Sequence, residues 1–130
     1  MAACLDNEWT INMSRDKTPT VFETLRLKLT ISNGVISGDM FYPATSTTRF
    51  STVSGTCQPL AKPDGNLMTV EFNWGLVDIF MVAFTHPQAS FTKFKGRFIA
   101  TKHNFDNFDK ELAALIPDDG DTGTGTGQMT

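Results

Sequence analysis

Apolar and polar residues alternate one by one through much of the first hundred residues. The clearest run is ETLRLKLTIS at 23–32, in which every second side chain from Leu25 to Ile31 is apolar and the residues between are Arg26, Lys28 and Thr30. Successive side chains of a strand point to opposite faces of a sheet, so this period predicts a β-strand with one buried and one hydrated face.

Turn residues separate this run from the next. Asn33-Gly34 is the dipeptide that type I′ hairpin turns prefer, and it joins 23–32 to VISGDMFY at 35–42, which Pro43 ends because proline cannot donate to the ladder. Pro63-Asp64-Gly65 is a second turn signal. We therefore predict an antiparallel sheet with short connections.

Further strand-like runs follow the same pattern: EWTINMS, RFSTVSGTC, LMTVEFNW, VDIFMVAF and FTKFKGRFIA. Together they make about seven strands in roughly a hundred residues, which predicts an all-β fold, a small antiparallel barrel or sandwich. VDIFMVAF at 77–84 is almost continuously apolar, so we expect it to be buried on both faces or to form an oligomer contact.

The C-terminal part has a different character. FDKELAALI, from Phe108, carries apolar residues at helical spacing and ends before Pro117, and the DDGDTGTGTGQMT that follows has little to bury. We predict a barrel domain at 1–105, a short helix at 106–117 and a flexible Gly/Thr/Asp-rich tail at 118–130. The tail lacks the acidic spacing and closing Glu of a calcium loop.

Composition narrows the function classes. A chain of 130 residues has single-domain length, its net charge is −3, and its 11 Lys and Arg residues are scattered, so we expect no nucleic-acid partner. It has no apolar run of about 20 residues and its first residues lack signal-peptide features, so we expect no membrane partner. Localisation stays open: secreted or periplasmic if a signal peptide has been removed, otherwise cytoplasmic.

The cysteines leave two readings open. Cys4 and Cys57 could form a disulfide in an oxidising compartment or remain two buried thiols in a reducing one. Their spacing matches no zinc motif, and only His86 and His103 could add imidazole ligands. We expect no metal site and no bound cofactor.

Signatures of catalysis are absent from the sequence. It has no GxSxG elbow, no HExxH and no phosphate-binding glycine loop. Asp39, Glu71 and Asp78 lie in predicted strands, where we expect them to face solvent, and His103 lies in a polar segment. We therefore expect no catalytic residues and no enzyme activity. The alternative, a small cyclase or isomerase, would need an interior carboxylate with a raised pKa.

Aromatic residues are frequent, with 11 Phe, two Trp and one Tyr. Core packing explains any single ring, but small barrels that enclose a ligand also line it with aromatic rings. Four stretches stand out: SGDMFYPATSTTRFSTVSGT, with its two glycine-bearing strands, EWTINMS, DGNLMTVEFNW and FKGRF. Together they resemble the family of avidin and streptavidin-like proteins. The resemblance covers about residues 7–98 and extends to the wider calycin group, which includes lipocalin-like barrels.

The resemblance implies an eight-stranded up-and-down barrel that binds a small molecule such as biotin in its mouth and forms a homo-oligomer. Biotin would be a ligand and not a cofactor. The family pattern implies polar contacts, apolar contacts and a covering loop from eight ligand-binding residues: Asn12, Ser14, Met40, Tyr42, Ser46, Phe72, Thr92 and Phe94.

The sequence also departs from that family. Phe72 and Phe94 stand where the family has pocket tryptophans, and the acidic residue near its chain end has no counterpart here. The chain is also longer between these two residues, where VDIFMVAF lies. An alternative function is therefore a protein-binding or inhibitory barrel with a filled interior, whose sites would be 76–84 and the loop at 43–48.

Overall fold

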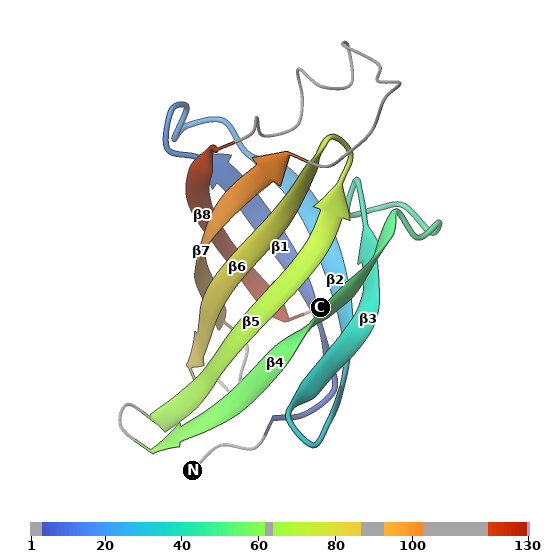
Figure 1. Ribbon diagram of the computed structural model, residues 1–130, viewed down its shortest axis with the longest axis vertical. Coiled ribbons are helices and arrows are strands. Elements are labelled where there is room, and N and C mark those ends of the chain that lie inside the picture. The colour runs from blue at the N-terminus through green and yellow to red at the C-terminus, as the bar shows by residue number, and fades with distance from the viewer. Residues whose placement is uncertain (1–3, 62–63, 87–92, 103–119, 130) are drawn as a thin grey trace.

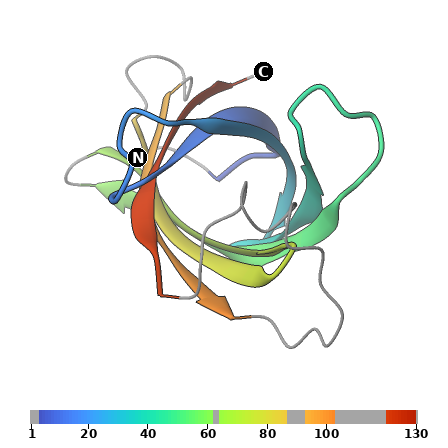
Figure 2. The same ribbon diagram turned by 90° about the horizontal axis from the view of Figure 1, so that it is seen from above.

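The chain folds into a closed β-barrel. A computed structural model describes residues 4–61, 64–86, 93–102 and 120–129. Its eight strands follow one another around the barrel in chain order, each antiparallel to the next, and the last pairs with the first (Figures 1 and 2). The strands are β1 (Asn7–Arg15), β2 (Glu23–Ser32), β3 (Val35–Phe41), β4 (Ser51–Ala61), β5 (Asp64–Trp74), β6 (Val77–His86), β7 (Lys93–Lys102) and β8 (Thr122–Met129).

The sequence prediction of an all-β up-and-down barrel is thereby confirmed. Odd-numbered strands run toward one end of the barrel, which we call the upper end because it is uppermost in Figure 1. Even-numbered strands run toward the lower end. The described residues contain no helix, and so none that could span a membrane.

The alternation in the sequence decides which side chains fill the barrel. Leu25, Leu27 and Leu29 of β2 are fully buried, whereas Lys28 and Thr30 between and beyond them are exposed. The other strands add the remaining interior side chains, which are Trp9, Ile11, Met13, Ile36, Met40, Val53, Cys57, Met68, Val70, Phe72, Trp74, Val77, Ile79, Met81, Ala83, Phe94, Phe98 and Ala100.

The hairpin between β2 and β3 forms as the sequence predicts. Asn33 and Gly34 both have positive φ, 52° and 76°, as a type I′ turn requires. The backbone N–H of Cys57 donates to the carbonyl of Gly34 at 2.8 Å, which ties the turn to β4. The turn thus fixes the register that buries one face of each strand.

Strand β8 corrects the prediction of a flexible tail over 118–130. Residues 122–129 pair with β7 on one side and with β1 on the other, so the barrel also extends beyond the predicted limit of 1–105. The predicted helix at 106–117 lies outside the described residues.

The alternating threonines and glycines of β8 explain this difference. A Cβ at Gly123 would lie 2.5 Å from the Phe98 ring, and one at Gly125 would lie 2.9 Å from the sulfur of Met81. Large side chains from other strands therefore occupy the inner space, and the strand that closes the barrel needs inward residues without side chains. Side chains of other strands, such as Phe98 and Met81, therefore supply the apolar contacts on the inner face of β8.

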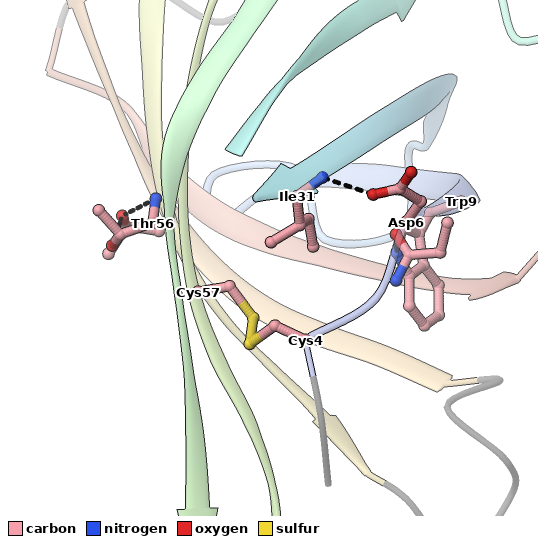
Figure 3. The surroundings of a disulfide bond; sticks show 8 residues. Cys4, Asp6, Trp9, Ile31, Thr56 and Cys57 are labelled. Atoms are coloured by element: carbon pink, nitrogen blue, oxygen red, sulfur yellow. Dashed lines mark hydrogen bonds between the residues drawn. A yellow bond between two sulfur atoms is a disulfide. The ribbon is translucent and has the colours of Figure 1, made fainter. Parts of the chain in front are cut away.

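A disulfide joins Cys4 to Cys57 at the lower end (Figure 3). The sequence left open whether these cysteines form a disulfide or remain two thiols, and the structure shows the disulfide. The segment between Cys4 and β1 is also held by Asp6, whose carboxylate accepts a hydrogen bond from the backbone N–H of Ile31 at 2.7 Å (Figure 3). The N-terminal segment is thus fastened to β2 and β4 at the lower end.

Candidate functional site at the upper end of the barrel

The family resemblance implied eight ligand-binding residues, of which the structure buries three inside the barrel. Met40 and Phe72 lie near the upper end, where β3 and β5 finish. Phe94 lies at the lower end, near the start of β7, and its ring centroid is 5.6 Å from that of Trp9. The three side chains therefore do not surround one space. Thr92 lies outside the described residues.

Two of the eight residues lie on the outer side of β1. Ile11 and Met13 point inward, so Asn12 and Ser14 point outward. Asn12 is exposed and its Oδ1 accepts a hydrogen bond from the hydroxyl of Thr24 at 2.8 Å. Ser14 is covered, and its hydroxyl donates to the carbonyl of Pro19 at 3.1 Å.

The loop between β3 and β4 is held against the outside of the barrel by Arg26. This guanidinium donates to the carbonyls of Ala44, at 3.0 Å, and Ser46, at 2.8 Å. It also forms an ion pair with Glu8 at 3.0 Å and stacks 4.0 Å above the ring of Phe41. In Figure 2 the loop extends beside the barrel wall. Ser46 accordingly lies beside β2 and not across the opening.

Tyr42 is part of an aromatic group at the upper end. Its ring meets Trp74 edge-on with a centroid distance of 5.2 Å and Phe50 in the same way at 5.9 Å. Such edge-to-face contacts are favourable because the positive ring edge meets the negative ring face. We call Tyr42, Phe50 and Trp74 the upper aromatic cluster.

The Tyr42 hydroxyl donates to a carboxylate oxygen of Glu23 at 2.9 Å. Burial first, and then this hydrogen bond and the negative charge of Glu23, raise the pKa of Tyr42 to about 12. The phenol thus stays protonated even at alkaline pH and keeps its proton for the hydrogen bond to Glu23.

Trp74 carries a polar group that has no partner. Its side chain is 1% exposed, and its indole N–H makes no hydrogen bond. By contrast, the indole N–H of Trp9 donates to Oδ1 of Asn7 at 2.6 Å. The family resemblance did not single out Trp74, although its place as the last residue of an alternating apolar strand was a usable signal.

The three strand carboxylates considered for catalysis do not point into the barrel. Asp39 faces outward and pairs with Arg49 at 3.4 Å, Glu71 is exposed, and Asp78 accepts from the amide of Asn73 at 3.3 Å. Within the described residues, the buried carboxylate is Asp121, and Lys17 pairs with it at 2.8 Å.

The described residues contain no cluster of three or more potential metal ligands. The upper end combines the rings of Tyr42, Phe50 and Trp74 with an indole N–H that has no partner and a phenol that is hydrogen-bonded to Glu23. In comparisons with known proteins, no family model, no curated protein and no solved structure matches this chain.

Proposed function

We propose that this chain is a non-enzymatic barrel that binds a small ligand at its upper end, against the upper aromatic cluster. The observation that carries this proposal is the buried indole N–H of Trp74 without a partner. Buried polar groups are nearly always hydrogen-bonded, and leaving one unpaired costs about 1–3 kcal/mol. A ligand acceptor atom placed at this N–H would remove that cost.

The cluster also indicates the kind of ligand. Tyr42 and Phe50 are half-buried and offer ring surface, and the indole of Trp74 can only donate, so the ligand should combine a flat or apolar body with a hydrogen-bond acceptor. Biotin has a ureido carbonyl on a compact bicyclic body and belongs to this class. It is also the ligand that the resemblance to avidin implies, so it is the first compound to test.

The test compares two tryptophan variants in thermal unfolding with and without biotin. A ligand at a hundredfold excess over its Kd adds about 2.7 kcal/mol, which raises Tm by roughly 10 °C in a domain of this size. We expect this rise in the native protein and in Trp9→Phe, whose ring lies at the other end. Trp74→Phe keeps most of the ring but removes the donor, so the rise should shrink.

Fluorescence gives a second readout of the same site. The chain has two tryptophans, so Trp9→Phe leaves Trp74 as the only one, and its emission should change on titration with the ligand. An unchanged Tm and an unchanged Trp74 emission would rule out biotin. Equal rises in both variants would show that the indole donor has no role and would contradict the site.

A second candidate function is binding of a protein partner through the outer wall. Phe80 and Val82 of β6 and Ile99 of β7 point outward and are 39–42% exposed, and Phe80 lies opposite Ile99 in the sheet. Phe80 and Val82 belong to the near-continuous apolar run that the sequence singled out, and Ile99 extends the patch onto β7. Only the inner face of that run is buried against the barrel interior, so its outer face favours a partner, either a second copy or another protein.

Sedimentation of Phe80→Ser against the native protein separates the two functions. A native oligomer that the variant dissociates would support the protein contact. A monomer in both cases, together with a biotin-dependent Tm, would favour the small-ligand function alone.

A further inference from the structure

The outside of the barrel carries a hollow of about 750 Å³ across the neighbouring strands β1, β8, β7 and β6. We call it the outer-wall hollow. It lies toward the lower end, away from the upper aromatic cluster. The residues that line it are Thr10, Asn12, Phe84, Lys93, Phe94, Lys95, Thr126, Gly127, Gln128 and Met129. Its volume is within the range of small-molecule sites, about 300–1,000 Å³.

The register of the strands explains the arrangement of its polar groups. Gln128 of β8 lies between Thr10 of β1 and Lys93 of β7. One step along, Thr126 lies between Asn12 and Lys95 in the same way. Outward side chains of neighbouring strands are about 5 Å apart, so the two rows bring their polar groups to one ligand-sized area.

The charge of the hollow has one sign. Lys93 and Lys95 are exposed lining residues, and no carboxylate is among the described residues that line the hollow. This contrasts with the whole chain, whose net charge is −3. Two ammonium groups without a local acid attract an anion and repel a cation.

The neutral groups also favour an anion. Because Oδ1 of Asn12 accepts the hydroxyl proton of Thr24, the amide nitrogen of Asn12 remains the donor that this side chain offers to the hollow. Thr126 and Gln128 can donate as well. Phe84 adds apolar surface to the lining.

We propose that the outer-wall hollow binds a small organic oxyanion, a carboxylate or a phosphate ester carried on an apolar body. The two lysines would neutralise its charge, Asn12 and Thr126 would donate hydrogen bonds to its oxygens, and the apolar lining would contact its body. This site is separate from the upper aromatic cluster and does not depend on the function proposed for it.

The experiment is an NMR titration of the full ¹⁵N-labelled chain with three probes of the same size. 2-Naphthoate and 2-naphthyl phosphate carry the two headgroups, and 2-naphthol has the same body without a charge at neutral pH. We expect the anions to shift the amide signals around Thr10, Lys95 and Thr126, and 2-naphthol to bind much more weakly. The tighter of the two anions identifies the headgroup.

Lysine variants test whether the ammonium groups of Lys93 and Lys95 bind the anion. Replacing both lysines, as Lys93→Met with Lys95→Met, should weaken the anion by about tenfold or more because two charge-assisted contacts are lost. Lys28→Met removes a lysine from the outer face of β2 and should leave the affinity unchanged. Trp74→Phe should also leave the affinity for the anion unchanged. The test of the outer-wall hollow is therefore independent of the test of the upper aromatic cluster.

Three results would overturn the proposal. One is the absence of any shift with either anion at millimolar concentration. Another is equal affinity for 2-naphthol, because the charge would then play no part. The third is an equal loss of affinity in Lys28→Met and in the double variant. Such a loss would show that the anion responds to the overall charge of the protein and not to the lysines of the hollow.

Discussion

Trp9 and Trp74 are chemically the same residue in opposite circumstances. Both are buried, but one indole N–H has an acceptor 2.6 Å away and the other has none. A solvent-exposed donor would find water, whereas a buried one depends on what the protein or a ligand supplies. At the scale of single residues, the two tryptophans therefore differ in one hydrogen bond, and the proposed ligand site rests on the missing acceptor at Trp74.

Asp16 gives a residue-scale prediction about acid stability. Both of its oxygens accept from Arg97, at 2.9 and 2.8 Å, and one also accepts from the hydroxyl of Thr122. The Arg97 bond, then the Thr122 bond, lower the pKa of Asp16 from 3.8 to about 2. A carboxyl with a lowered folded-state pKa stabilises the fold above its ordinary pKa, and this contribution is lost as the pH falls through the folded-state value.

We therefore expect the native protein to lose stability between about pH 4 and pH 2, and Asp16→Asn to lose less over that window. Urea denaturation at several pH values measures this difference. Asp39→Asn is the control, because Asp39 makes one 3.4 Å contact with Arg49, and it should keep the native pH dependence. Identical pH dependence in native protein and Asp16→Asn would contradict the assignment.

At the scale of elements, β8 illustrates why one strand was missed and others were not. The hairpin at Asn33-Gly34 and the alternation of β2 depend on neighbours in sequence, so the sequence alone predicts them. The glycines of β8 make sense only beside Phe98 and Met81, which belong to strands distant in the chain. The Gly- and Thr-rich composition of residues 118–130 predicts a flexible tail, because the segment itself does not show which strands it packs against.

The candidate site, too, has features that the local sequence predicts and features that depend on distant residues. Alternation correctly predicts that Met40 and Phe72 share the apolar faces of their strands. The outward direction of Asn12 could also be read from the inward phase of Ile11 and Met13, since a shift of one residue reverses the face. The unpaired N–H of Trp74 could not be predicted, because it depends on every group around the ring.

Gly123→Ala tests the role of β8. A Cβ there would collide with the carbonyl of Ser14, a backbone atom, and would press on the Phe98 ring. We expect a loss of about 3 kcal/mol, the upper part of the range for overpacking, because backbone cannot move aside as a side chain can. Thr124→Ala changes an outward position of the same strand and should cost about 1 kcal/mol or less. Urea denaturation measures the free energy of unfolding of both variants. Equal losses in Gly123→Ala and Thr124→Ala would contradict this packing.

At the scale of the whole molecule, the disulfide is the single covalent link across the fold. It joins residues 53 positions apart, and the chain-entropy model assigns a loop of that length about 4 kcal/mol of stabilisation. We expect Cys4→Ser with Cys57→Ser to lower the free energy of unfolding by about that amount. Adding a reductant to the native protein should lower its free energy of unfolding by the same amount. A loss of less than about 1 kcal/mol would mean that the lower end is held by Asp6 and strand pairing instead.

The even number of strands has a practical consequence for handling the protein. Because the first strand begins where the last strand ends, Trp9 lies opposite Met129, and Cys4 is fastened nearby. A linker joined to either end of β1–β8 would therefore leave from the lower end. A sensor chip coupled through such a linker would present every molecule in the same orientation, with Tyr42, Phe50 and Trp74 toward the flowing solution.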